Sequence, residues 1–234
     1  MPLDTEPDPV ITPPEDQSSL VNHVVNNIID GVSTGRYAHG QRLIAADLAE
    51  EYGVSRAPVR EALHVLAGEG VVKLTPNRGA KIRKLSAKQL FDFLEFTESI
   101  CSLGVRLATS KMIEPANRAT MDQCFEALQE AWDRRHGRDF VTALYTYHVE
   151  LNHISGNQFV DFFYRRPYIR FYTVLLADMV PGIHWEQYIL NYRRIHDTIM
   201  DGDDHAAVAT FVSHIRWVLD LLRQEKGRRD EPAI

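Results

Sequence analysis

The stretch of residues 43–66, LIAADLAEEYGVSRAPVREALHVL, constrains this chain most, because two short helical patterns meet there at a glycine. The first pattern covers residues 45–52 and the second covers residues 56–69, and apolar residues recur in both at helical spacing. Gly53 between them has the backbone freedom that ends a helix, and Ser55 is a favoured N-cap residue for the next helix. The pattern predicts a helix-turn-helix.

Two arginines give the second helix a basic face. Arg56 and Arg60 are four residues apart and therefore share one side of its N-terminal end. In a helix-turn-helix, residues at this place contact base edges and phosphates in the major groove of DNA. A solvated basic face on an ordinary helical hairpin explains the two arginines equally well. The segment that follows distinguishes this interpretation from DNA binding.

That next segment, residues 70–85 (GVVKLTPNRGAKIRKL), predicts a β-hairpin. Residues 71–74 and 80–83 have the composition of short strands, and the five residues between them include proline, asparagine and glycine. At the tip, Gly79 allows a close approach to a phosphate, and Arg78 is suited to a narrow minor groove. A hairpin of this kind directly after a recognition helix is a wing, and it favours DNA binding.

The run VSRAPVREALHVLAGEGVVKLTPNRGAKI resembles the winged helix-turn-helix of GntR-type bacterial transcription regulators, and the match covers about residues 18–84. This resemblance implies a double-stranded DNA operator as partner. It also implies contacts to DNA from five residues: Ser55, Arg56, Arg60, Arg78 and Gly79. The chain departs from the family at residues 45–46, two alanines where an arginine is often present, so we expect one contact to a base or phosphate to be missing and DNA binding to be retained.

Composition is ordinary for a soluble globular protein, with 44% hydrophobic and 25% charged residues among 234. No apolar run approaches the roughly 20 residues of a membrane helix, and the N-terminus lacks the features of a signal peptide. Cys101 and Cys124 are too few and too far apart for a disulfide framework or a zinc motif. These features predict a cytoplasmic protein with no membrane partner.

Charge is distributed unevenly along the chain. The net charge is −6, whereas residues 18–84 hold nine basic and six acidic residues. A modestly basic segment in an acidic protein fits a DNA-binding domain. Its weak net charge predicts a homodimer that depends on well-placed contacts more than on bulk electrostatics.

The expected domains are a disordered, proline-rich tail (residues 1–17), the winged helix-turn-helix (18–84) and a helical domain (85–228). Ser86 and Gln89 form a capping-box pattern at the start of the helical domain. The predicted fold class is mainly α, with the winged helix followed by an all-α bundle of six helices. These helices are expected at residues 86–111, 115–135, 139–154, 158–179, 183–200 and 205–225.

Two stretches of the helical domain, YHVELNHISGN (147–157) and YRRIHDTIMDGD (192–203) with a later SHI (213–215), resemble a known effector domain. It is the all-helical domain that follows the winged helix in the FadR branch of GntR regulators, and six helices suggest the VanR-like subgroup. The resemblance implies a small-molecule effector. In the family a divalent metal is often held by an Asp-x-x-x-His pair and two later histidines.

Only half of that metal-binding pattern is present. His148 and His214 match two of the histidines, but Leu144 stands at the aspartate position and Tyr192 at the remaining histidine position. Divalent metals usually need three or four protein ligands, so the sequence predicts no metal and no other cofactor. His196, one helical turn past Tyr192, would replace the missing histidine only if the helix shifted.

The resemblance also places an effector cavity in the helical domain. Thr97 and Cys101 stand where the family often has an arginine and a glutamate. The predicted effector-binding residues are Thr97, Cys101, Leu144, His148, Tyr192 and His214. This cavity is less charged than the family norm, and it predicts a neutral or aromatic ligand. Alternatively, the two histidines are core residues that hydrogen-bond each other or the tyrosine.

Aromatic residues are dense between Phe159 and Tyr172. Core packing or a helix–helix dimer face explains this density more readily than an effector-binding wall. Arg165 and Arg166 interrupt the aromatic run and are expected at the surface.

Together these features predict a homodimeric transcription regulator without enzymatic activity. Its affinity for an operator is controlled by a small-molecule effector, because the effector and DNA favour different placements of the DNA-binding domains. Two alternatives remain open from the sequence: a metal-dependent enzyme on the helical bundle, and an architectural DNA binder with a vestigial pocket.

Overall fold

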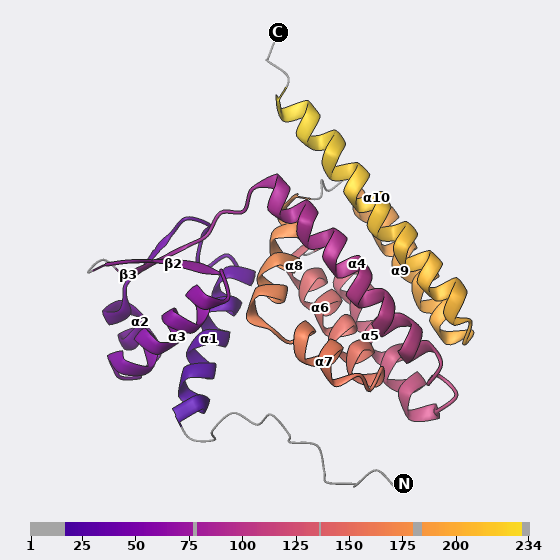
Figure 1. Cartoon of the computed structure of the whole chain (residues 1–234), viewed down its shortest axis with the longest axis horizontal. Coiled ribbons are helices and arrows are strands. Elements are labelled where there is room, and N and C mark those ends of the chain that lie inside the picture. The colour runs from indigo at the N-terminus through magenta and orange to yellow at the C-terminus, as the bar shows by residue number, and fades with distance from the viewer. Residues whose placement is uncertain (1–16, 77–78, 136, 180–183, 231–234) are drawn as a thin grey trace, which may run out of the picture.

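A computed structural model describes residues 17–76, 79–135, 137–179 and 184–230. Within these residues the chain forms ten α-helices and three short strands. Figure 1 shows a winged-helix unit, built from α1–α3 and the strands, beside a bundle of the remaining helices. Residues 1–16 of the predicted tail lie outside the described residues, and Gln17 already belongs to α1.

The winged-helix unit confirms the predicted helix-turn-helix and wing. Gly53 has a positive φ of 65° between α2 and α3, as a glycine that ends a helix requires. The strands form an antiparallel sheet in the order β1-β3-β2, so a third strand that was not predicted joins the wing. The elements are α1 (Gln17–Ser33), β1 (Arg42–Leu43), α2 (Ala45–Glu51), α3 (Arg56–Gly68), β2 (Val72–Thr75) and β3 (Gly79–Ile82).

The helical domain begins with the predicted capping box. The hydroxyl of Ser86 accepts a hydrogen bond from the backbone N–H of Gln89 at 3.3 Å, and the Gln89 side chain accepts one from the Ser86 N–H at 3.0 Å. Helix α10 packs along α4, and α5 packs along α6 (Figure 1). The helices are α4 (Ala87–Thr109), α5 (Pro115–Asp133), α6 (Gly137–Ile154), α7 (Gln158–Tyr164), α8 (Pro167–Met179), α9 (Trp185–Met200) and α10 (Asp204–Asp230).

The helix predicted for residues 158–179 is wrong as a single element. It is two helices, α7 ending at Tyr164 and α8 starting at Pro167. Proline disfavours the helical conformation of the residue before it and fits the first turn of a new helix. The described part of the helical domain therefore contains seven helices instead of the predicted six, while its all-α class is confirmed.

Helix α8 packs against α1 and joins the two halves of the molecule. Phe171 and Leu175 are buried in the hydrophobic cluster of the winged helix, although both belong to the helical domain. Arg166 pairs with Glu69, and Arg170 pairs with Asp30. Arg165 is exposed as predicted, whereas Arg166 is part of this junction.

No helix within the described ranges is both long enough and apolar enough to cross a bilayer.

Candidate DNA interface and effector site

A cleft of about 820 Å³ opens between the helix-turn-helix and the wing. The predicted contact residues Arg56 and Arg60 line it from α3, with both side chains exposed, and Gly79 lines it from the wing. Its other described lining residues are Arg42, Ile44, Ala45, Ala46, Leu63, His64, Leu74, Thr75 and Pro76. The cleft therefore presents guanidinium groups beside the exposed start of the recognition helix.

Of the two other predicted DNA contacts, Ser55 lies within the described residues and Arg78 does not. Ser55 is the exposed N-cap residue of α3, but its hydroxyl makes no capping hydrogen bond. It precedes Arg56 at a helix N-terminus, where backbone N–H groups favour a phosphate. Arg78 lies outside the described residues.

The structure gives a reason for glycine at position 79 that the sequence did not indicate. Its φ is +82°, and a Cβ atom at this position would collide with the carbonyl oxygen of Leu43 on β1. Glycine is therefore required here for β3 to pack against β1, in addition to any role at the DNA.

A row of basic residues crosses the wing sheet. Arg42 on β1 pairs with Lys81 on β3, and Lys81 pairs with Lys73 on β2. Directly opposed residues share a sheet face, and all three side chains are exposed. Arg42 also lines the cleft, as does Ala46. The family often has an arginine at residues 45–46, where this chain has alanines. The row was missed because the β1–β3 pairing is not visible in the sequence.

The six predicted effector-binding residues are all buried in the helical domain. The hydroxyl of Tyr192 lies 2.7 Å from Nε2 of His148, and its ring centroid lies 4.9 Å from that of His214. Helices α6, α9 and α10 thus bring three of the predicted residues together. Thr97, Cys101 and Leu144 are also buried, and the Thr97 hydroxyl donates to the Phe93 carbonyl of its own helix at 2.9 Å.

Burial keeps this group of side chains uncharged. It lowers the pKa of His148 to about 4. Burial and the nearby His148 lower the pKa of His214 to about 3. Burial also raises the pKa of Cys101 to about 12 and holds the pKa of Tyr192 well above its ordinary value. At neutral pH the site therefore offers hydrogen-bonding groups without a formal charge.

Within the part of the chain that the structure describes, each histidine has one buried ring nitrogen without a hydrogen-bond partner, Nδ1 of His148 and Nε2 of His214. Asn191 Nδ2, which can only donate, lies 3.3 Å from Nδ1 of His214. Neutral His214 must therefore carry its proton on Nε2, which leaves a buried donor without an acceptor. Such a group costs roughly 1–3 kcal/mol unless a ligand or water satisfies it. The sequence left open that both histidines are core residues hydrogen-bonded to each other or to Tyr192. The structure shows such a bond for His148, to Tyr192.

Two further tyrosine rings lie close to the histidines: Tyr164, which belongs to the aromatic run noted in the sequence, and Tyr188, which was not predicted. The ring centroid of Tyr164 lies 5.5 Å from that of His148, and that of Tyr188 lies 4.6 Å from that of His214. Tyr188 is four residues before Tyr192, so helical spacing was an available signal for it. His196 instead contacts α5, with Nε2 3.2 Å from Asp122 Oδ1.

The polar groups at this site do not fit a divalent metal. Leu144 has no donor atom, and the neutral Tyr192 hydroxyl is already bonded to His148. Among residues 17–76, 79–135, 137–179 and 184–230, no group of three or more His, Cys, Asp or Glu side chains is placed to hold a metal ion. Two histidines alone leave such an ion mostly to water.

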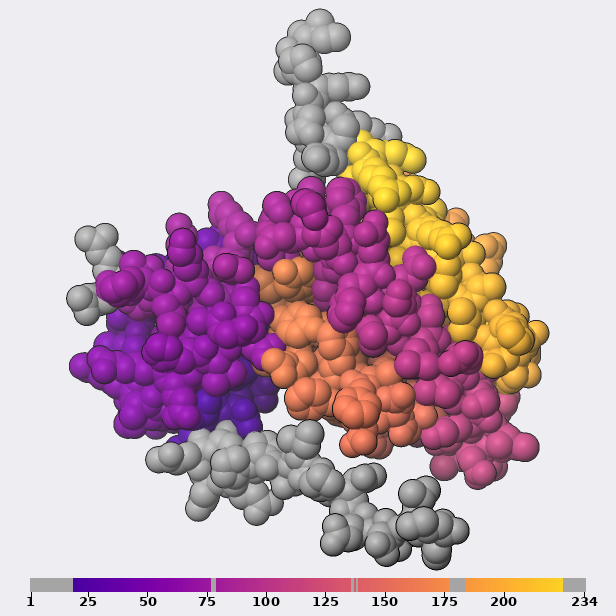
Figure 2. Space-filling view, viewed as in Figure 1, coloured from indigo at the N-terminus to yellow at the C-terminus, as the bar shows by residue number. Residues whose placement is uncertain are grey.

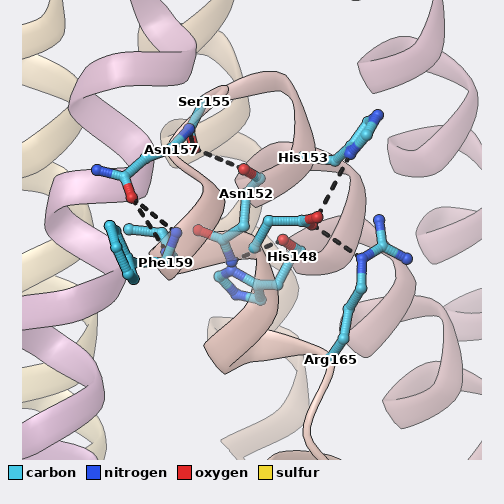
Figure 3. Close-up of polar contacts among 9 residues, drawn as sticks. His148, Asn152, His153, Ser155, Asn157, Phe159 and Arg165 are labelled. Carbon is cyan, nitrogen blue, oxygen red and sulfur yellow. Dashed lines mark hydrogen bonds and ion pairs between the residues drawn. The ribbon is translucent and has the colours of Figure 1, made fainter. Parts of the chain in front are cut away.

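A network of hydrogen bonds connects the site to the break between α6 and α7 (Figure 3). Asn152 Nδ2 donates to the carbonyl oxygen of His148 at 2.8 Å, and the Ser155 hydroxyl donates to the carbonyl oxygen of Asn152. Asn157 Oδ1 then accepts from the first N–H groups of α7, including that of Phe159 at 3.0 Å. The predicted break at Ser-Gly-Asn therefore fixes where α7 starts relative to His148.

A winged helix with a basic cleft, joined to an all-helical domain with a buried polar site, defines a ligand-responsive DNA-binding regulator. Residues 20–82 match the family model of the bacterial regulatory proteins of the gntR family, and residues 92–216 match that of the FCD domain. The chain belongs to the GntR family and has the FadR-like FCD domain. It is a DNA-binding transcription regulator with an effector-binding domain, and its family is not one of enzymes.

Two relatives are similar to this chain over most of its length. The chain is 23% identical over 214 residues to the probable D-xylose utilization operon transcriptional repressor of Paenarthrobacter nicotinovorans, covering 92% of this chain and 93% of the relative. It is 24% identical over 181 residues to the HTH-type transcriptional regulator McbR of Escherichia coli, covering 77% and 78%.

The solved structure of E. coli McbR/YncC has a TM-score of 0.77 at 20% identity, with 88% of this chain and 98% of that chain covered. A putative transcriptional regulator GntR from Rhodococcus has a TM-score of 0.71 at 21% identity, with 89% and 98% covered. These two structures show the same fold.

Proposed function

We propose that this protein is a cytoplasmic, homodimeric regulator whose operator affinity is controlled by a neutral small molecule. The winged helix (residues 18–84) binds a pseudo-palindromic operator through Arg56, Arg60 and the wing. The helical domain (residues 85–228) binds the effector among His148, Tyr192 and His214, with Thr97, Cys101 and Leu144 as further lining residues. The helical domain is of the FadR-like FCD type. The VanR-like subgroup was inferred from six helices, whereas the described part of this domain has seven.

One observation supports the effector class more than any other. Each of the two neutral, buried histidines has a ring nitrogen that finds no hydrogen-bond partner among the described residues, and an aromatic ring lies close to each imidazole. A carboxylate effector would need a cation or a metal to balance its charge, and the predicted cavity residues include neither. A neutral ligand with an acceptor for His214 Nε2–H satisfies the site without that cost.

Contacts between side chains lead from this site to the winged helix. The ring of Tyr164 lies between those of His148 and Tyr145, with centroids 5.5 Å and 5.8 Å away. The guanidinium of Arg170 lies 5.7 Å from the Tyr145 centroid, and Arg170 pairs with Asp30 on α1. We infer that a ligand at His148 shifts α7 and α8 and so the winged helix, and a coupling of about 1–3 kcal/mol is sufficient for useful regulation.

The experiment is a binding cycle on the full chain. An operator is first selected from random duplexes, and its affinity is then measured with a panel of neutral aromatic molecules and of matched carboxylates. We expect a neutral compound to change operator affinity about 5- to 150-fold. Tyr192→Phe, which keeps the ring and removes the hydroxyl, should weaken that compound's binding and leave effector-free DNA binding unchanged. A response confined to carboxylates would overturn the proposed effector class.

A further inference from the structure

His196 lies between the surface of the helical domain and its candidate effector site. Its Nε2 is 3.2 Å from Oδ1 of Asp122 on α5, and its Nδ1 is 3.3 Å from the hydroxyl oxygen of Tyr147 on α6. The Asp122 side chain is 54% exposed, whereas Tyr147 is fully buried. Figure 2 shows the start of α5 at the molecular surface beside the turn between α9 and α10, where Arg118 donates to the carbonyl oxygen of Met200 at 2.6 Å. Two hydrogen bonds therefore lead from solvent into the core.

The direction of these two hydrogen bonds follows from the chemistry of the partners. A carboxylate can only accept, so a neutral His196 carries its proton on Nε2 and donates it to Asp122. Nδ1 is then an acceptor, and the Tyr147 hydroxyl donates to it. Burial raises the pKa of Tyr147, so its hydroxyl keeps the proton that this bond requires. Among the described residues the hydroxyl has no other hydrogen-bond partner, so Tyr147 is held by a group that can itself titrate.

The ring of Tyr147 supports the candidate effector site. Its centroid lies 6.1 Å from that of Tyr192, and the two ring planes are at 86°. The Tyr192 hydroxyl in turn lies 2.7 Å from Nε2 of His148. A displacement of the Tyr147 ring therefore removes an edge-to-face contact from a residue that we propose binds the effector.

Protonation of His196 reverses the donor pattern at Nδ1. An imidazolium donates from both ring nitrogens, so its Nδ1–H faces the donating hydroxyl of Tyr147. The hydroxyl then loses its acceptor, and a buried donor without an acceptor is unfavourable. The contact with Asp122, by contrast, becomes an ion pair. Protonation therefore strengthens the outer hydrogen bond and breaks the inner one.

The groups that face His196 act on its charge in both directions. Burial lowers the pKa of the imidazole, and the hydrogen bond and charge of Asp122 on α5 oppose that shift. On the histidine's own helix, Asp197 favours the protonated ring and Arg193 disfavours it. The ring of Phe125 on α5 stacks on the imidazole with centroids 4.3 Å apart and carries no charge. The imidazole is therefore neutral at pH 7 and becomes charged in more acidic solution.

We propose that His196 is a positioning residue that makes the effector site sensitive to pH: its neutral ring holds Tyr147 against Tyr192, and its protonated ring releases Tyr147. The proposal rests on the proposed function, because it concerns the same site. Effector binding then weakens as the pH falls, and proton concentration becomes a second signal to which the regulator responds.

The test follows histidine and tyrosine rings of the full chain by NMR between pH 7.5 and pH 5, without effector or DNA. Tyrosine ring carbons are labelled, and Tyr147→Phe and Tyr192→Phe assign their signals. We expect His196 to have its proton on Nε2 at pH 7.5 and to titrate within this range. The signals of Tyr147 and Tyr192 should shift with the same midpoint. His148 stays mostly neutral in this range, because its pKa is about 4.

Two variants separate this role from a merely structural one. His196→Gln keeps a donor for Asp122 and an acceptor for Tyr147 but does not titrate, so the tyrosine signals should stay at their neutral-pH positions down to pH 5. Asp122→Asn removes a charge from an exposed side chain and should lower the His196 midpoint by about 0.2–0.7 pH unit, the size of an exposed ion pair. His153→Gln is the matched control, because His153 is exposed and also lies 3.6 Å from an aspartate, and it should leave the midpoint unchanged.

Three results would overturn the proposal. They are a His196 ring that stays neutral to pH 5, a His196 titration during which the Tyr192 signals do not move, and tyrosine shifts that persist in His196→Gln. None of them involves a ligand, so each leaves the proposed effector and operator standing. If the NMR shifts are present and every compound of the panel leaves operator affinity unchanged, the proposed function is overturned and the pH-sensitive contact is not.

Discussion

Arg166 of the helical domain forms a two-point ion pair with Glu69, the residue directly after recognition helix α3. Its Nε lies 3.2 Å from Oε2 of Glu69, and its Nη2 contacts Oε1. Glu69 is the C-cap residue of α3, where a negative charge is unfavourable beside the helix dipole. The guanidinium of Arg166 offsets that charge and connects the end of α3 to the start of α8.

Replacing Arg166 should therefore weaken both the junction and the response to effector. Arg166→Ala leaves a mostly buried carboxylate without its partner, and we expect it to cost about 1–3 kcal/mol in the free energy of unfolding. Adding Glu69→Gln should recover part of that loss, and a double-mutant cycle in urea measures the coupling. The effector's influence on operator affinity should fall in Arg166→Ala but not in Arg134→Ala, an exposed control. Additive effects in the cycle would refute the coupling.

The basic row on the wing should affect stability and DNA binding in opposite directions. Like charges opposed across strands destabilise a sheet, so Lys73→Gln and Lys81→Gln should each raise the free energy of unfolding by about 0.2–1 kcal/mol. If the row contacts phosphates, each variant should also reduce the salt slope of operator binding by about 1. Lys88→Gln, in the helical domain, is the control for both measurements. Lower stability, or an unchanged salt slope, would count against this role.

The recognition-helix arginines should determine sequence preference. Both line the cleft with exposed side chains, and a bidentate arginine–guanine contact contributes about 1–3 kcal/mol of discrimination. Arg56→Ala and Arg60→Ala should therefore each weaken specific binding about tenfold or more, with folding intact by circular dichroism. Wild-type operator affinity in both variants would exclude the assigned contacts.

The sequence predicted the elements that local signals define. Gly53 and the Ser86 capping box mark helix ends within a few residues of chain, so the helix-turn-helix and the start of α4 were found. The two-residue strand β1 was missed, because its pairing with β3 depends on residues almost 40 positions away. The start of α8 at Pro167 was also missed, because residues 158–179 were predicted as one helix.

The sequence predicted a weakly charged group of residues in the helical domain, but it did not predict the hydrogen bonds among them. His148, Tyr192 and His214 were found through resemblance, and the structure brings them together. The unpartnered nitrogens depend on side-chain geometry, since Asn191 fixes the His214 tautomer and Tyr192 satisfies only one side of His148. The Arg166–Glu69 pair joins residues 97 positions apart, a separation for which the sequence offers no local signal.

His148 and His214 should stay neutral at pH values below the ordinary pKa of histidine. With the pKa of His148 at about 4 and that of His214 at about 3, both imidazoles are uncharged in the folded state at pH 5.5. Nitrogen-15 NMR should show neutral rings at that pH, with the His214 proton on Nε2. An imidazolium signal from either residue at pH 5.5 would contradict the burial described for the site.

The same shifts predict a pH dependence of stability. Both histidines have a lower pKa in the folded state than in the unfolded state. Their contribution to the free energy of unfolding is therefore fully present above about pH 6.5. It is lost as the pH falls toward 4 for His148 and toward 3 for His214. Below about pH 6.5 each histidine should contribute a slope of up to about 1.4 kcal/mol per pH unit. Urea unfolding at pH 7 and pH 5.5 measures it, and His148→Gln with His214→Gln should flatten the difference.

The absence of a metal is the prediction that departs most from the family. Elemental analysis of protein purified without a histidine tag should find far less than one zinc, nickel or manganese per chain, because Leu144 and Tyr192 supply no ligand at neutral pH. The geometry also indicates how to create a site. Tyr192 lies against both His148 and His214, so Tyr192→His inserts a third imidazole between them.

Leu144 is one helical turn before His148 on α6, so Leu144→Asp adds a carboxylate on the same face. The double variant should therefore bind a divalent ion with four ligands, and calorimetry should detect it, while Leu144→Asn with Tyr192→Phe serves as a control of similar size. Near-stoichiometric metal in the wild type would refute the predicted absence. If the double variant folds normally and binds no metal, the four positions do not converge on one point, and the effector-binding residues assigned from them are wrong as well.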